Sequence, residues 1–587
     1  MKAVAVTTLI TLAEVVSAFA QPASLATAFV NVQLIRMDQE RIELDQTVLV
    51  QGDRIVAVGR SADLRPPANA QVVDGQARYL LPGLVDSPVH LTTDMPWAPA
   101  RSDFGDAPLY LAHGVTTVVN LRGTPTQLEW KRRIEAGELL APTIYTAGEF
   151  INEPRVVTVA DMEREIAQQA RDGYDLVKFH EIWAPGVGFT TRDGLSHESY
   201  LAMFRAARNA GLPVVGHVPV NLGLDALIAS SGGAVAHTGE FNRLHFLLGL
   251  RTLLPTIAGA LVLLMLISGW AAGWLWRRVR GRASDRSLRL GRAKLLLTAV
   301  LIAALAVLVG GFLVGPGGLF YTSAAWRIAT TVSASGLMVL ALLSIVVTIK
   351  LWRERELPVR TKLPIAAGAI ASAALMLLVA IGWLPFLWRN TDAGIARVAM
   401  RLRSAGIAVQ SSLIVYTVMD PDSADRIFRD PSFSVLSART QNLWRQMAED
   451  RRGRSFETLL LPPRLAEFTQ TIAGTFHRHG VRLLAGTDAM GLPRAIPGSS
   501  LLRELELLNR SGLTPYEAIR TATVNAASFL ERNEDFGTIA VGKRADLLLL
   551  DRNPLETLDA LDHPVGVMVR GRWLPRERLQ AMLSALR

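Results

Sequence analysis

Cysteine is missing from the 587-residue sequence. This absence excludes thiol catalysis, zinc sites built from thiolates and disulfide bonds, and it leaves the redox compartment undetermined. Charged residues make up 19% of the chain, yet they are missing from four long apolar stretches. Half of all residues are hydrophobic and the mean hydropathy is +0.26, which predicts a membrane part beside a soluble one.

Each of the four apolar stretches is long enough to cross a bilayer, for which about 20 helical residues suffice. Four such stretches in succession indicate membrane spans in contact with lipid rather than buried helices of a large soluble core. Ionisable residues inside a membrane mark ion and proton pathways, and their absence here disfavours a channel or transporter. The stretches are 253–276, 295–315, 328–349 and 363–388.

The net charge of +10 lies in two loops that connect these stretches. Loops 277–294 and 350–362 together contain thirteen basic and three acidic residues, whereas the middle loop has only Arg327. By the positive-inside rule the two basic loops are cytoplasmic, and both ends of the region lie outside. The rest of the chain is neutral overall, which removes the main support for nucleic-acid binding.

The first 20 residues fit a secretory signal, with Lys2, an apolar stretch 3–13 and the small-x-small sequence Ala18-Phe19-Ala20. Glu14 counts against this interpretation, and an uncleaved anchor or an ordinary first helix are the alternatives. An exported N-terminus requires the same topology as the basic loops. We therefore expect a membrane protein whose soluble part lies on the extracytoplasmic, periplasmic side.

Strand patterns occur at both ends of the chain and repeatedly between them. Alternating apolar residues at 28–34, 48–50 and 55–59 predict hairpins, and a matching set at 545–550 and 565–569 is expected to complete a small β-sandwich. Between these ends, eight strands alternate with helices, which predicts an α/β fold with a (β/α)8 TIM-like barrel. The expected barrel strands are 81–90, 114–120, 143–148, 174–179, 213–217, 234–237, 407–416 and 481–488.

These patterns divide the chain into six parts. They are a signal peptide (1–20), the first part of the β-sandwich (21–75), barrel strands 1–6 (76–245), an inserted bundle of four transmembrane helices (246–390), barrel strands 7–8 (391–535), and the second part of the β-sandwich with a C-terminal helix (536–587).

Five polar side chains stand at the ends of expected barrel strands: His90, Lys178, His217, His237 and Asp488. Alone, each has a simpler explanation, because a single histidine in a strand is usually hydrogen-bonded and a single lysine usually forms an ion pair. In a barrel, however, the C-terminal strand ends face one mouth. Imidazoles and a carboxylate converging on a cation form a catalytic zinc-type site with an open position for water.

The sequence resembles the amidohydrolase superfamily, in particular its imidazolonepropionase-like and prolidase-like branch. The resemblance covers 30–245 and 391–573. Its most specific pieces are Leu81-Pro82-Gly83-Leu84-Val85-Asp86, Gly486-Thr487-Asp488, and a tail that runs from Gly512-Leu513-Thr514-Pro515 to Arg544-Ala545-Asp546.

This resemblance implies hydrolysis of an amide or peptide-like C–N bond in a small-molecule or peptide substrate, with a metal-activated water and with Asp488 as the catalytic proton acceptor. It also implies one or two divalent metal ions, with zinc expected. His217 and His237 would hold one metal, His90 and Asp488 would contact the other, and Lys178 would be carboxylated and bridge the two.

One position departs from the family pattern Asp-x-His-x-His, because Pro88 stands where the first histidine belongs. A mononuclear hydrolase, a dinuclear site completed by another group, and a silent barrel that serves as an extracytoplasmic binding or sensing domain all remain open. His180 and Glu240 are possible replacement ligands, although polar positions on the surface of barrel loops are the simpler interpretation of both. The substrate and the oligomeric state are not predicted.

Overall fold

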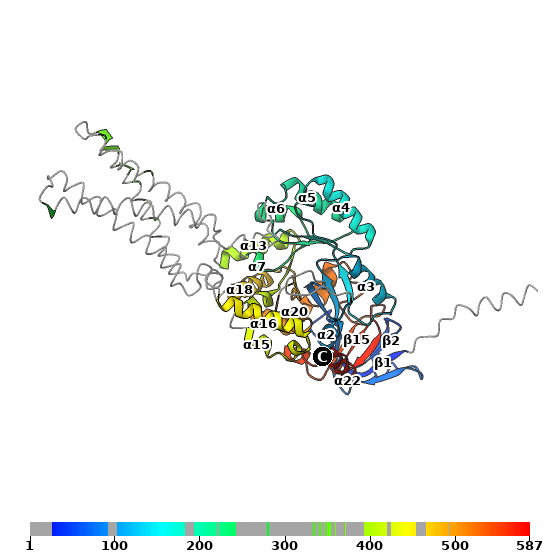
Figure 1. Cartoon of the computed structure of the whole chain (residues 1–587). Coiled ribbons are helices and arrows are strands. Elements are labelled where there is room, and N and C mark those ends of the chain that lie inside the picture. The colour runs from blue at the N-terminus through cyan, green and yellow to red at the C-terminus, as the bar shows by residue number, and fades with distance from the viewer. Residues whose placement is uncertain are drawn as a thin grey trace, which may run out of the picture.

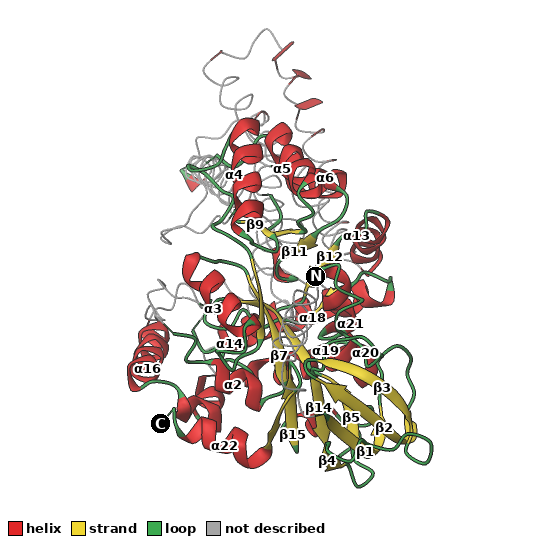
Figure 2. Ribbon diagram, turned by 90° about the vertical axis from the view of Figure 1, so that its right-hand side faces the viewer, coloured by secondary structure: helices red, strands yellow, loops and turns green. Residues whose placement is uncertain are grey.

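The computed structural model describes residues 26–91, 103–181, 193–219, 222–241, 392–419, 424–453, 465–491 and 493–586, together with isolated positions between 279 and 370. Within these ranges the chain forms a parallel barrel surrounded by helices, and a separate sheet packs beside it (Figures 1 and 2). The predicted α/β, TIM-like architecture is therefore present.

The separate sheet, which we call the end sheet, is built from both ends of the described chain. Its strand order is β16-β15-β14-β5-β1-β2-β3, with β4 paired to β1, so the strands connect as one sheet. The two ends meet where β14 pairs antiparallel with β5 and Leu548 lies opposite Leu81. The strands are β1 (Thr27–Leu34), β2 (Glu43–Gln51), β3 (Arg54–Arg60), β4 (Gln71–Asp74), β5 (Tyr79–Pro82), β14 (Leu547–Leu550), β15 (Gly566–Val569) and β16 (Arg572–Pro575).

Gly83 marks the point where the chain leaves the end sheet and enters the barrel. Its N–H donates to the carbonyl of Asp546 in the end sheet, and the next N–H, of Leu84, donates to the carbonyl of Gly114 beside the second barrel strand. A Cβ atom at Gly83 would lie 2.1 Å from Oγ1 of Thr116. Only glycine therefore allows this close approach.

The barrel contains the eight strands β6 to β13. Hydrogen-bonded ladders join β6-β7-β8 and β9-β10-β11-β12-β13, all parallel. Isolated bridges close the circle, from Ala147 to Leu176 on one side and from Val89 to Ala489 on the other. The strands are β6 (Leu84–Val89), β7 (Val115–Asn120), β8 (Thr143–Thr146), β9 (Val177–Phe179), β10 (Val214–Gly216), β11 (Ala234–Val235), β12 (Ala408–Gln410) and β13 (Leu483–Leu484).

Helices pack around the barrel, and their apolar faces are buried against its strands (Figure 2). Several begin at side-chain caps: Thr124, Thr158 and Thr514 each start a helix with a capping box. The described helices are α2 (Ala107–Ala112), α3 (Pro125–Glu135), α4 (Val159–Asp172), α5 (His197–Asn209), α6 (Gly223–Ser230), α7 (Gly239–Phe241), α13 (Asp392–Ser404), α14 (Leu413–Met419), α15 (Ala424–Phe428), η5 (Pro431–Val435), α16 (Ala438–Gly453), α18 (Leu465–Arg478), α19 (Ser499–Arg510), α20 (Pro515–Thr521), α21 (Val524–Phe529), η6 (Leu558–Leu561) and α22 (Arg576–Ser584).

The seventh barrel strand is shorter than the sequence pattern predicts. The apolar run 407–416 was expected to be one strand, but β12 ends at Gln410 and α14 begins at Leu413. The buried carboxylate of Glu504 explains this end, because it accepts hydrogen bonds from the backbone N–H groups of Leu413 (3.0 Å) and Ile414 (2.7 Å). A distant glutamate thus caps the first turn of α14, which a local apolar pattern does not reveal.

The predicted signal peptide (1–20) lies outside the described residues, and of the four predicted membrane spans the structure describes isolated positions only. Within the described ranges, no helix has the length and apolar character needed to cross a membrane. The membrane insertion therefore stays a prediction from sequence.

Candidate active site

The five predicted site residues lie at or just beyond the C-terminal ends of five barrel strands. His90 follows β6, Lys178 lies in β9, His217 follows β10, and His237 and Asp488 come shortly after β11 and β13. All are buried except His237, which is partly exposed. The fold thus places the five side chains toward one end of the barrel.

His237 and Asp488, just beyond β11 and β13, have left-handed backbone conformations, at φ 68° and 55°. Such conformations are uncommon outside glycine, and histidine and aspartate are among the residues that tolerate them best. Non-glycine residues held in this region cluster at functional sites.

His90 and Asp488 are in direct contact where the first and last strands of the barrel, β6 and β13, meet. Nε2 of His90 lies 3.1 Å from Oδ1 of Asp488, and both side chains are about nine-tenths buried. Burial acts to raise the pKa of Asp488, but the positive charges of His237, His90 and Lys178, with His90 in direct contact, outweigh it and hold the pKa below its usual value. Asp488 is therefore an ionised carboxylate at neutral pH.

His217 has its tautomer set by the backbone. Nδ1 of His217 lies 3.0 Å from the carbonyl oxygen of Glu181, which can only accept, so Nδ1 carries the proton and the lone pair of the neutral ring is on Nε2. Carbonyl partners of this kind orient histidines that bind metals. The ring of His237 lies 5.5 Å from that of His217, centroid to centroid, in an edge-to-face arrangement.

Lys178 is 1% exposed, and its Nζ has no hydrogen-bond partner in the described part of the chain. Burial lowers the pKa of Lys178 to about 8, and the negative charges of Asp488 and Glu240 limit the fall. The amine is therefore surrounded by the cluster rather than paired in a salt bridge at the end of the barrel.

His180 and Glu240 are not surface residues of barrel loops, so the simpler interpretation of the sequence is wrong for both. His180 is 8% exposed and Glu240 5%. Oε2 of Glu240, in α7, lies 3.8 Å from Nδ1 of His217. Burial lowers the pKa of His180, and the positive charges of Lys178, His90 and His237 lower it further. Both side chains therefore belong to the cluster.

Pro88 lies in β6 and contributes a backbone contact only. Its carbonyl accepts a hydrogen bond of 2.8 Å from the N–H of Asp488. No ligand atom therefore replaces the missing imidazole at this position, as the sequence indicates.

The donor atoms of the cluster fit a metal ion in kind. Nδ1 of His90, like Nζ of Lys178, is buried and has no hydrogen-bond partner among the described residues, and such atoms cost free energy unless something binds them. Nevertheless, no three histidine, aspartate or glutamate residues in the described ranges form a group that would hold a metal ion on their own. A further ligand atom is needed to complete a metal site.

The sequence did not predict two contacts that organise this end of the barrel. Asp86 accepts hydrogen bonds from the backbone N–H and from Oγ1 of Thr487. The carboxylate of Glu181 is buried and accepts a 2.7 Å hydrogen bond from the N–H of Leu195. Asp86 and Thr487 both belong to the motifs that carry the family resemblance. Their closeness in the sequence to His90 and Asp488 was the signal that could have indicated a contact between them.

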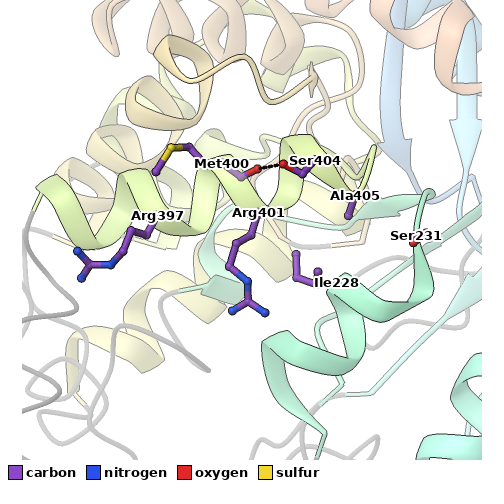
Figure 3. A pocket seen from close by; sticks show the side chains of 7 residues that line it. All are labelled: Ile228, Ser231, Arg397, Met400, Arg401, Ser404 and Ala405. Atoms are coloured by element: carbon purple, nitrogen blue, oxygen red, sulfur yellow. Dashed lines mark hydrogen bonds between the residues drawn. The ribbon is translucent and has the colours of Figure 1, made fainter.

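A cavity of about 520 Å³ lies outside this cluster, between α6 and α13 (Figure 3). None of the predicted site residues lines it. Arg401 in its wall bonds Asp225 at 2.5 Å, and Oγ of Ser404 bonds the carbonyl of Met400. The cavity is lined by Ile228, Ser231, Arg397, Met400, Arg401, Ser404 and Ala405. It is a groove between two outer helices of the barrel.

Known proteins share this fold and parts of this sequence. Among solved structures, a bottromycin amidohydrolase is 18% identical with a TM-score of 0.56, covering 96% of this chain and 90% of that one. A Xaa-Pro dipeptidase with methionine bound in its active site is 14% identical with a TM-score of 0.53, covering 94% and 100%. Likeness at this level of identity shows the fold alone.

Sequence relatives match over shorter segments. The imidazolonepropionase of Sphingopyxis alaskensis is 45% identical over 75 residues, which are 13% of this chain and 18% of that protein. The chain thus matches less than a fifth of the length of that relative. Residues 374–574 match the model of the amidohydrolase family. This part of the chain is therefore similar to the amidohydrolase family.

Proposed function

We propose that the protein is a metal-dependent hydrolase of amide or peptide-like C–N bonds in a small-molecule or peptide substrate. The observation that carries this proposal is the convergence of His90, Lys178, His217, His237 and Asp488 at one end of the barrel. The names of the relatives, an imidazolonepropionase and a Xaa-Pro dipeptidase among them, describe hydrolases of this general class.

His217, His237 and Lys178 would hold one divalent ion, with zinc as our candidate, and His90 with Asp488 would contact a second. A carboxylated Lys178 would add two oxygen atoms to the ligand atoms that the histidines and Asp488 supply. Such an ion lowers the pKa of a bound water toward about 7 and polarises a substrate carbonyl.

Residues of the chain itself would accept the proton and keep the catalytic side chains in one orientation. Asp488 is ionised and therefore able to accept the proton of the attacking water and to pass it to the leaving nitrogen. His90 contacts one oxygen of this carboxylate at 3.1 Å and so fixes its direction. The carbonyl of Glu181 holds His217 in one tautomer, which keeps the ring in one orientation.

We further propose that 246–390 anchors the enzyme in a membrane with the barrel on the extracytoplasmic side. The chain leaves the described fold at Phe241, four residues after His237, and returns at Asp392. The departure point lies at the same end of the barrel as the candidate site. The entrance to the site would therefore lie toward the membrane surface, where a membrane-associated substrate is available.

Elemental analysis and an activity screen of the purified full-length protein test the proposed function. We expect bound divalent metal and hydrolysis within a panel of Xaa-Pro dipeptides, N-acyl amino acids and cyclic amides, with activity lost on chelation and restored by zinc. A protein that binds no divalent ion and hydrolyses none of these compounds would contradict it.

Pro88 favours a second candidate, a silent barrel that binds or senses a ligand outside the cytoplasm. The same panel distinguishes the two. A silent barrel would be stabilised against heat by one of the compounds without converting it, whereas the enzyme releases product.

A further inference from the structure

A small cavity lined by charged side chains lies apart from the candidate active site, between α14, α15 and α19. Its volume is about 110 Å³, and none of the five predicted site residues lines it. Pockets that take a whole small molecule usually measure about 300–1,000 Å³. This cavity therefore has room for a single chemical group. Its charged lining residues are Arg426, Asp430, Arg494, Arg503, Glu506 and Arg510.

Positive charge exceeds negative charge around this cavity. Among the described residues that line it, four guanidiniums face two carboxylates, which leaves an excess of two positive charges. Guanidiniums are not deprotonated in proteins, so this excess is present at neutral pH. Like charges held close together repel, and a bound anion would offset the repulsion. The charge balance therefore favours an anionic ligand.

The two carboxylates leave most of the guanidinium donors unused. Oδ2 of Asp430 accepts a hydrogen bond of 2.5 Å from Nη2 of Arg503, and its Oδ1 accepts the N–H of Ser432 at 2.8 Å. Nη2 of Arg510 lies 3.7 Å from Oε2 of Glu506, which is too far for a hydrogen bond. A guanidinium has five N–H donors, so Arg503 and Arg510 both keep donors for a further acceptor.

Buried polar groups line the same cavity. Arg494 is 4% exposed, and its backbone has the left-handed φ of 75°, which is uncommon outside glycine. Ser500, on α19, is 3% exposed, and its Oγ accepts the N–H of Ile496 at 2.8 Å. This bond uses a lone pair of the hydroxyl and leaves its proton to be donated. Hydrogen bonds from groups shielded in this way are stronger than those formed in bulk water.

We propose that this cavity binds a phosphate group, either as inorganic phosphate or as the end of a small phosphate monoester. Guanidinium forks match the geometry of phosphate oxygens and bind them in pairs. The excess of two positive charges corresponds to the charge of a phosphate monoester, about −1.5 to −2 at pH 7. This site goes beyond the proposed function and does not depend on it, because no residue of the candidate active site takes part.

Isothermal titration calorimetry of the full-length protein tests the assignment, with inorganic phosphate and glycerol phosphate as the two probes. The ionic strength is kept constant with sodium chloride, because surface attraction between charges is screened by salt. We expect one site per chain with a Kd below about 1 mM for at least one probe. Binding should persist after treatment with a chelator, which separates the cavity from any metal ion in the active site.

The variant Arg426→Gln removes one lining charge at an exposed position, so the fold should tolerate it. We expect its Kd to rise by about tenfold or more, as for the loss of a hydrogen bond to a charged group. Ser500→Ala removes a neutral donor and should raise the Kd by about 2- to 10-fold. Arg429→Gln is the matched control, because it makes the same charge change at an exposed position that does not line the cavity.

The two probes distinguish the source of the phosphate group. Tighter binding of glycerol phosphate would identify a phosphorylated small molecule as the ligand, and tighter binding of inorganic phosphate would identify the free anion. The absence of binding of both probes up to about 10 mM would overturn the site. Equal weakening by Arg426→Gln and Arg429→Gln, or loss of binding on chelation, would also overturn it, since either result places the anion elsewhere.

Discussion

Asp86 accepts two hydrogen bonds from Thr487, one from the backbone N–H at 2.8 Å and one from Oγ1 at 2.7 Å. Asp86 lies in β6 and Thr487 follows β13, so this pair joins the first and last strands of the barrel. The next residue, Asp488, donates its N–H to the carbonyl of Pro88. The pair thus fixes the position from which Asp488 reaches His90.

We expect Asp86→Asn to be tolerated at about pH 6 and to be more stable than the native protein at about pH 9. Burial raises the pKa of Asp86 from 3.8 to about 8, although the hydrogen bonds from Thr487 oppose the shift. Because this pKa is higher in the folded state, the folded chain binds more protons across that window, and the free energy of unfolding falls as the pH rises through it. Asparagine does not titrate and avoids this loss, which urea unfolding at the two pH values measures.

Asp86→Ala is the contrasting variant, because it leaves the buried N–H of Thr487 without its acceptor. We expect a loss of roughly 1–3 kcal/mol in the free energy of unfolding at both pH values. If the asparagine variant lost as much stability as the alanine variant at about pH 6, the ionised form of Asp86 would be the one that the fold requires.

We expect Asp488→Asn to lower the turnover number by roughly 100- to 10,000-fold, the usual contribution of a positioned proton acceptor. The amide keeps the size of the side chain and one oxygen atom, so the melting temperature should change little, and the ion that His217, His237 and Lys178 would hold should stay bound. Hydrolysis assays and elemental analysis of the same preparation check both points. Asp562→Asn, at an exposed position, serves as the control, and undiminished turnover in Asp488→Asn would remove the assigned role.

The barrel and the five strand-end residues could be predicted because both depend on local pattern. A buried parallel strand is a short apolar run, and the residue that follows it lies at the mouth wherever the fold is a barrel. The run 114–120 corresponds to β7 (Val115–Asn120), and His217 directly follows β10. No knowledge of distant contacts is needed for either inference.

The remaining features depend on contacts between residues far apart in the sequence. The burial of His180 arises from stacking on Phe150, which comes from another loop, and the early end of β12 arises from Glu504, on α19. Likewise, the link between Asp86 and Thr487 spans 401 residues. A local pattern contains no signal for such pairs, because they exist only after the barrel closes.

The predicted membrane topology leads to a test by reporter fusions. A reporter that is active only in the cytoplasm should be active when fused within loop 277–294 or loop 350–362, because basic loops are retained inside. A fusion within 316–327, which has a single basic residue, should be inactive. A periplasmic signal from either basic loop would reverse the orientation and place the barrel on the other side.

One buried arginine, Arg544, makes contacts to both the end sheet and the barrel. Nε of Arg544 lies 2.6 Å from Oδ2 of Asp546, Nη1 lies 2.9 Å from Oδ2 of Asp535, and Nη2 donates to Oγ1 of Thr117 in β7 at 2.8 Å. The guanidinium also lies over the ring of Phe536, 4.8 Å from its centroid. Arg544 therefore links the C-terminal part of the chain to the second barrel strand.

Replacing Arg544 by methionine should cost roughly 3–5 kcal/mol in the free energy of unfolding, because Asp546 is 5% exposed and would be left as an uncompensated buried charge. The double variant with Asp546→Asn removes that charge and should recover part of the loss, although Asp546 also accepts a hydrogen bond from the N–H of Arg570. Arg578→Met, at an exposed position on α22, should change stability by less than about 0.5 kcal/mol. Urea unfolding of the three variants measures the effects. A loss in Arg544→Met no larger than that in Arg578→Met would mean that the link to Thr117 and the two aspartates does not hold the end sheet in place.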